Sequence, residues 1–113
     1  MRVPHNARPV HEAKASLFRV LGHPVRVRIL ELLRDGERSV GALQADLGLD
    51  SGGTSQHLAA LRRIGLVESR REGTSVIYRV GDERVFDLLE AGRAIIERQL
   101  VEQQALLRDL GTG

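Results

Sequence analysis

The sequence predicts a single domain that is mainly α-helical and carries one small β-hairpin. Apolar residues recur every three or four positions over most of the chain, which is the spacing of amphipathic helices. Residues 66–80 break this pattern with two short runs rich in β-branched residues, which is typical of a hairpin. The 113 residues suffice for one compact core, and no apolar run approaches the ~18 residues of a membrane-spanning helix. We therefore expect a soluble protein with no membrane partner.

The predicted helices are bounded by glycine, proline or a capping residue. Gly22 ends the first helix, and Pro24 opens the second after His23, which we expect to be a cap or turn residue. Ser39 has the residue type and place of an N-cap for the third helix. The helices are expected over residues 10–21, 24–34, 40–47, 54–64 and 83–110, with a turn over 49–53. Residues 1–9 contain two prolines and no periodicity, so we expect a flexible N-terminal tail ahead of a domain over residues 10–110.

The hairpin follows two short helices that are joined by a tight, glycine-containing turn. Its strands are expected over residues 66–70 and 75–80, with Arg71–Thr74 as the loop. A helix-turn-helix followed by such a hairpin is the winged helix-turn-helix arrangement, whose second helix enters the major groove of DNA. The predicted fold is therefore a winged helix-turn-helix with four helices, a β-hairpin and a long last helix.

Charge and cysteine content narrow the class of function. The net charge is +2, but residues 51–81 carry five arginines against two glutamates, whereas residues 82–113 carry four arginines against seven acidic residues. This division indicates one surface for a polyanion and a separate surface for another partner. The absence of cysteine excludes disulfides, thiolate metal sites and thiol catalysis. The first residues lack the apolar stretch of a secretory signal, so we expect a cytoplasmic protein.

The fourth helix has one apolar face and one small, polar face. At ~100° per residue, a helical wheel places Thr54, His57, Leu58, Leu61, Ile64 and Gly65 on the core side. The opposite arc holds Ser55, Gln56, Ala59, Ala60, Arg62 and Arg63. Because His57 lies at the flank of the apolar arc, we expect it to form a hydrogen bond within the domain rather than to contact a base.

We expect the exposed arc and the hairpin to contact double-stranded DNA. Ser55 and Gln56 suit base edges, and glutamine suits adenine in particular. The arginines of the helix end and of the hairpin suit phosphates or a narrow minor groove. The residues expected at DNA are Ser39, Ser55, Gln56, Arg62, Arg63, Arg70, Arg71 and Thr74. The alternative is a solvated helix face and a solvated charged turn.

The last helix carries a heptad-like series that a small core cannot cover. Its members alternate three- and four-residue steps, and a dimer interface explains them. The series comprises Leu89, Gly92, Ile96, Gln99, Gln103, Leu106 and Leu110.

Four separated motifs resemble the ArsR/SmtB family of bacterial winged-helix transcriptional regulators. They are LGHPVRVRIL at residues 21–30, SQHLAALR at 55–62, GLV at 65–67 and RREG at 70–73. The resemblance covers roughly residues 10–100. It implies a homodimer joined through the first helix, including Leu17, and the last helix, with two recognition helices set for a palindromic operator.

The sequence departs from the metal sites that the resemblance implies. Cysteine ligands near the third helix are absent, and the last helix has Asp87-Leu88-Leu89 in place of an Asp-x-His pair. No histidine follows His57, so neither familiar site is expected here. The remaining candidates are His5 and His11, whose imidazoles suit nickel or zinc. A carboxylate of the last helix, from Glu97 or Glu102, could complete such a site.

Two other functional classes are compatible with a small domain of this kind. A winged-helix module that binds only proteins, such as a second regulatory protein, is the main alternative, and the basic 51–81 segment argues against it. Catalysis is not expected, because Ser55 and His57 point to different sides of one helix and cannot form a nucleophile–base pair. Ser51-Gly52-Gly53-Thr54 also lacks the glycine and lysine spacing of a phosphate-binding loop.

Overall fold

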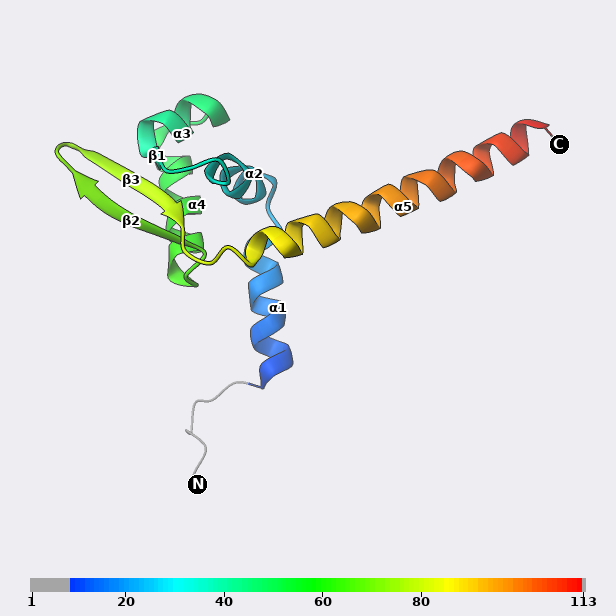
Figure 1. Ribbon diagram of the computed structural model, residues 1–113, viewed down its shortest axis with the longest axis horizontal. Coiled ribbons are helices and arrows are strands. Elements are labelled where there is room, and N and C mark those ends of the chain that lie inside the picture. Colours follow the sequence, from blue (N-terminus) through cyan, green and yellow to red (C-terminus); the bar gives the residue numbers. More distant parts are fainter. Residues whose placement is uncertain (1–8, 113) are drawn as a thin grey trace, which may run out of the picture. The chain divides into compact units, whose positions relative to one another are not determined.

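The computed structural model describes residues 9–112, which form two compact units (Figure 1). The first unit ends at Asp82 and the second begins at Glu83. The predicted flexible tail lies outside the described residues except for Pro9, which is the N-cap of the first helix. The elements are α1 (Val10–Leu21), α2 (Pro24–Leu33), β1 (Arg38–Ser39), α3 (Val40–Leu47), α4 (Ser51–Arg63), β2 (Val67–Glu72), β3 (Ser75–Val80) and α5 (Val85–Thr112).

The expected order of helices and hairpin is confirmed, and a short third strand is added. β1 has only two residues and pairs with β3, so the sheet has the antiparallel order β1-β3-β2. The sequence did not predict β1, because two residues are too few to show alternation. The hairpin turn is also tighter than expected. Arg71 and Glu72 belong to β2 and pair with Val76 and Ser75 of β3, which leaves Gly73 and Thr74 as the turn. Gly73 has a positive φ of 62°, which glycine adopts without strain.

Side-chain caps set the helix starts of the first unit. His23 Nδ1 accepts a hydrogen bond from Val25 N at 3.1 Å, and Ser39 Oγ accepts one from Ala42 N at 3.1 Å. Both predicted caps are therefore confirmed. The predicted start of α4 is wrong, because Asp50 Oδ1 accepts a hydrogen bond from Gly53 N at 2.8 Å and so caps a helix that begins at Ser51. The glycines expected in the turn thus lie in the first helical turn.

The core of the first unit lies where α2, α3 and α4 meet the sheet. Its fully buried side chains are Ile29, Leu30, Leu43, Thr54, Leu58, Leu61 and Val67. The buried Thr54 hydroxyl is satisfied, since it donates to the Asp50 carbonyl oxygen at 3.0 Å. At the base of the hairpin, a Cβ on Gly81 would lie 2.5 Å from the Gly65 carbonyl oxygen, so this close approach requires glycine.

Three positions of the helical wheel are wrong: Ala60, Ile64 and Gly65, the last of which follows the end of α4 and is exposed. Ala60 is expected on the exposed arc but is buried, because α4 packs against β2 as well as against α2 and α3 and so buries a wider arc. Ile64 is expected in the core but is 41% exposed. It is the C-cap residue, where the backbone leaves the helix with φ −104° and ψ 10°, so helical spacing no longer fixes its direction.

The second unit is the 28-residue helix α5. Its large exposed apolar residues fall mainly within about 140° of the helix circumference at 100° per residue. We call this set the α5 stripe: Leu88, Ile95, Ile96, Leu100, Leu106, Leu107 and Leu110. Of the predicted interface residues, Leu89 and Gly92 are half-buried, and Ile96, Gln99 and Gln103 are exposed along the same side. No helix of the described chain, α5 included, has the length and apolar character needed to cross a membrane.

Candidate nucleic-acid interface

The exposed face of α4 has the small, polar character predicted from the sequence. Ser55, Gln56 and Ala59 are exposed, and Arg62 and Arg63 extend this face at the C-terminal end. Within residues 9–112, Ser55 and Gln56 bond no other side chain, so their polar groups are available to a ligand. Short side chains on such a face allow close approach to a groove floor, and glutamine can pair with an adenine edge.

The two arginines at the end of α4 differ in their contacts. Arg62 Nη1 donates to Ser69 Oγ at 3.0 Å, which ties the end of α4 to β2. Arg63 is exposed and has no ion-pair partner among the described residues. Both positive charges also stabilise the C-terminal end of the helix dipole. Neither guanidinium is neutralised by a carboxylate of the described chain, so both can attract phosphate.

Strand alternation places the two arginines of the hairpin on opposite faces of the sheet. Successive side chains of a strand point to opposite faces. Arg71 therefore shares its face with Ser69 and with Val67, which is buried where β2 packs against α4. Arg71 and Thr74, which lies in the turn, are exposed, and Arg71 has no ion-pair partner among the described residues.

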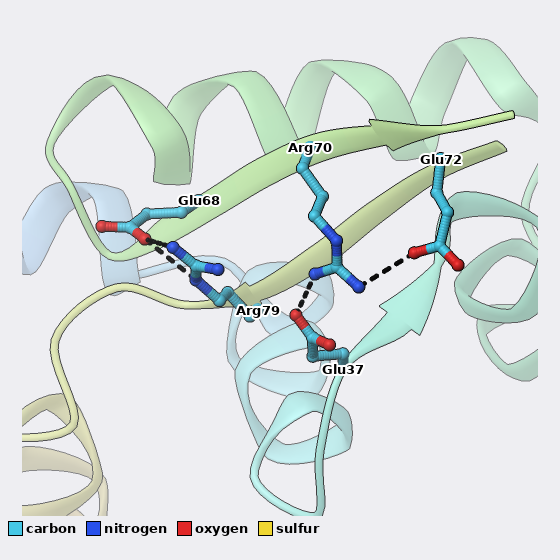
Figure 2. Close-up of polar contacts among 5 residues, drawn as sticks. All are labelled: Glu37, Glu68, Arg70, Glu72 and Arg79. Carbon is cyan, nitrogen blue, oxygen red and sulfur yellow. Dashed lines mark hydrogen bonds and ion pairs between the residues drawn. The ribbon is translucent and has the colours of Figure 1, made fainter.

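Arg70 lies on the other face and is held by two carboxylates (Figure 2). Its Nη1 donates to Glu37 Oε2, and its Nη2 donates to Glu72 Oε2 at 3.0 Å. The hydrogen bond from Arg70 lowers the pKa of Glu37 below its ordinary value, and the two carboxylates raise the pKa of Arg70. On the same face, Arg79 Nη2 donates to Glu68 Oε2 at 2.6 Å. DNA contact by Arg70 stays a prediction, and its guanidinium already carries two anionic partners.

The prediction for His57 is confirmed, since its ring forms a hydrogen bond within the domain. Arg26 Nε of α2 donates to His57 Nδ1 at 3.2 Å, and the rings of His57 and His23 lie 4.2 Å apart between centroids. Partial burial, followed by the charges of His23 and Arg26, lowers the pKa of His57. The neutral ring thereby links the middle of α4 to the start of α2.

Ser39, predicted at DNA, is half-buried, and its hydroxyl caps α3. Leu17, predicted at the dimer interface, is half-buried on α1. His11, predicted as a metal ligand, is exposed. His5 lies outside the described residues. Within the described part of the chain, no group of three or more His, Cys, Asp or Glu side chains is placed to hold a metal ion. Glu37 and Arg26 are not predicted from the sequence, because their partners are 33 and 31 residues away. No local pattern could have shown these pairs.

Comparisons with known proteins agree with this geometry. The family model for bacterial regulatory proteins of the arsR family matches residues 23–69. Rv0081, an HTH-type transcriptional regulator of Mycobacterium tuberculosis, is 43% identical over 106 residues, which are 93% of this chain and 93% of that protein. A biofilm growth-associated repressor of Agrobacterium fabrum is 40% identical over 81 residues, which are 72% of this chain and 69% of the repressor.

Solved structures give the same result. The crystal structure of Rv0081 matches with a TM-score of 0.77 at 42% identity, over 86% of this chain and 98% of that one. The solution structure of Mb0332 from Mycobacterium bovis, a homodimeric winged helix-turn-helix DNA-binding domain, matches with a TM-score of 0.72 at 33% identity. That match covers 88% of this chain and 92% of the other. The fold is a winged helix-turn-helix with a polar face on α4, and the relatives span almost the whole chain. The protein therefore belongs to the ArsR family of bacterial regulatory proteins and is a DNA-binding transcriptional regulator, not an enzyme.

Proposed function

We propose that the protein binds a palindromic operator as a homodimer and reads its sequence with α4. The observation that carries this proposal is the exposed face of α4, where Ser55 and Gln56 are uncommitted and three arginines without carboxylate partners in the described chain lie on or beside it. These arginines are Arg62, Arg63 and Arg71. Such a regulator acts where bacterial DNA lies, in the cytoplasm.

The roles within this surface follow from side-chain chemistry. Ser55 and Gln56 reach base edges in the major groove, where each good bidentate pair is worth about 1–3 kcal/mol of discrimination. Arg62 and Arg63, at the end of α4, and Arg71, in the hairpin, neutralise phosphates and set the register of the protein on the duplex. Thr74 lies in the exposed turn at the tip of the hairpin and contacts the DNA backbone beside the phosphate bound by Arg71.

The α5 stripe supplies the second half of the proposal. An exposed apolar surface of this length marks an interaction site, and two-fold pairing would present two copies of α4 to two half-sites. Arg93–Glu97 and Arg98–Glu102 ion pairs, at 3.0 and 3.2 Å, occupy the polar sides of the helix. The homodimeric state of Mb0332 supports a second copy of this chain as the occupant.

The direct test is to recover the DNA that the protein selects. Fragmented DNA from its source genome is incubated with the protein, and the retained fragments are sequenced. We expect an inverted repeat with half-site centres about 10–10.5 base pairs apart, or a multiple of this distance. The recovered duplex should bind at least about 1,000-fold more tightly than random duplex at physiological salt. Equal affinity for both duplexes would contradict sequence-specific recognition.

A metal response through His5 and His11 is proposed from the sequence alone. Two imidazoles and a carboxylate suit nickel or zinc, and a metal at the dimer interface could change DNA affinity by ~1–3 kcal/mol. Calorimetry with each ion on the wild type and on a His5→Ala/His11→Ala double variant tests it. Identical heats and identical DNA affinity would eliminate this site. A second regulatory protein on the same DNA likewise stays a prediction.

A further inference from the structure

The side chains of the hairpin are buried at its base and exposed in its outer half, and the change is abrupt. Val67 is buried and Ser69 is half-buried, whereas every residue from Arg70 to Ser75 is exposed. The base of the hairpin is fixed by Val67 in the core and by the hydrogen bond from Arg62 to Ser69. An isolated two-stranded hairpin is only marginally stable in water. Its outer half, which carries Arg71, therefore depends on whatever else holds it.

The Arg70–Glu37 ion pair lies at the point where burial ends and crosses the whole sheet (Figure 2). In the register, Arg70 of β2 faces Ile77 of β3, and Ile77 faces Ser39 of β1. Glu37 directly precedes β1 on the far side of the central strand. The pair thus joins the outer strand of the hairpin to the segment between α2 and β1. Backbone pairing between β1 and β3 extends over only two residues of each strand.

The charge around Arg70 argues against a role in binding phosphate. Glu37 and Glu72 both accept from its guanidinium, so the three groups together carry one net negative charge. A phosphate at this position would meet two carboxylates. On the opposite face, Arg71 carries a positive charge with no ion-pair partner in residues 9–112. The two faces of the hairpin therefore differ in what they offer to DNA.

We propose that Glu37 is a positioning residue for DNA binding. Through Arg70 it holds the outer half of the hairpin in the orientation that brings Arg71 to a DNA phosphate, while Arg70 itself contacts no DNA. This inference rests on the proposed function. It departs from the expectation drawn from the sequence, in which both Arg70 and Arg71 contact DNA. A carboxylate and a DNA phosphate repel each other, so charge alone would predict that Glu37 weakens DNA binding. The inference instead gives Glu37 a role that strengthens it.

The size of the effect follows from the exposure of the pair. The side chains of Arg70 and Glu37 are 44% and 42% exposed, so water screens their attraction. Exposed ion pairs of this kind shift an equilibrium by up to about fivefold. Loss of the pair should therefore weaken DNA binding about two- to fivefold for each hairpin, and up to about 25-fold for a dimer that uses both.

The test compares Glu37→Gln with Glu68→Gln in salt titrations of the full chain on duplex DNA. Both variants remove one exposed carboxylate from the same face, but Glu68 pairs with Arg79 inside the hairpin and does not reach across to β1. We expect Glu37→Gln to bind more weakly than the wild type with an unchanged salt slope. Glu68→Gln should bind as well as the wild type or more tightly, as expected for the loss of a negative charge.

Arg70 variants complete the cycle. Arg70→Gln should match Glu37→Gln in affinity and salt slope, and the double variant should lose no more than either single variant. Arg70→Lys, which keeps a positive charge beside Glu37, should recover part of the affinity. The free energies of unfolding of the same Glu37 and Arg70 variants, measured without DNA, test whether the two side chains are coupled in the folded protein.

Two results would overturn the inference: tighter binding by Glu37→Gln, or a salt slope that falls in Arg70→Gln by about 0.9 for each hairpin, as it does when a phosphate contact is lost. Failure of the wild type to bind any duplex would instead refute the proposed function. The two failures are therefore distinguishable.

Discussion

The exposed face of α4 and the α5 stripe are both surfaces of amphipathic helices, and they differ in what their side chains offer a partner. The α4 face combines small polar groups with arginines that lack carboxylate partners in the described chain. The α5 stripe presents leucine and isoleucine side chains, and Arg93 and Arg98 on the same helix are already paired with glutamates. One surface therefore suits a polyanion and the other suits burial against apolar groups. Two surfaces of such different chemistry on one chain allow DNA binding and self-association without competition.

The largest expected effect comes from breaking the α5 stripe. Ile96→Glu puts a charge into each half of the proposed interface, so we expect sedimentation to show a monomer. Loss of two-site attachment should weaken operator binding by roughly 10²–10⁴-fold.

Val101→Glu is the matched control for this change. Val101 is 61% exposed and Ile96 is 56% exposed, but five helical positions, or about 140°, separate their directions. Val101→Glu should stay a dimer. A dimeric Ile96→Glu with unchanged stability would show that the stripe is not the interface.

A smaller effect is expected on the α4 face. Gln56→Ala removes a proposed bidentate base contact and should weaken operator binding by about 1–3 kcal/mol while leaving random duplex almost unaffected. Gln104→Ala, at an exposed glutamine of α5, serves as the control and should change neither. Fluorescence anisotropy on both duplexes gives the comparison. Equal losses on operator and random DNA would remove Gln56 from the base-reading set.

The smallest expected effect concerns the link between α4 and α2. Because the pKa of His57 is lowered in the folded protein, the unfolded chain binds more protons near and below pH 6.5. The free energy of unfolding should therefore be highest above about pH 6.5 and should fall as the pH drops below this value. His57→Asn keeps a hydrogen-bond acceptor for Arg26 and cannot titrate, so it should reduce this fall.

Chemical denaturation at pH 7.5 and 5.5 measures the effect, with His11→Asn as the control at an exposed histidine. A pH dependence that is identical in the wild type and His57→Asn would show that His57 does not couple protonation to stability.

Local patterns in the sequence predicted most of the fold and the α4 face. Helix periodicity, the caps at His23 and Ser39 and the hairpin all depend on neighbours within a few residues. The start of α4 was missed because a helix that begins with glycines has no apolar period until later, although Asp50 is a good capping residue.

Pairing across the fold could not be predicted in this way. β1 exists only because β3 lies beside it, and Arg70 meets Glu37 only because the sheet brings them together. Sequence spacing therefore showed that Arg70 and Arg71 are adjacent and basic, but not that one is neutralised and the other is not.

The most direct measurement of the central claim is the salt dependence of operator affinity in two double variants. Arg63→Gln/Arg71→Gln removes two cations of the proposed DNA surface, whereas Arg19→Gln/Arg108→Gln removes two exposed cations from α1 and α5. Both variants change the net charge equally. We expect the slope of log K against log salt to fall by about 3.6 for the first dimer, which loses four phosphate contacts, and to stay unchanged for the second. Equal slopes in the two variants would contradict the assignment of this surface to DNA.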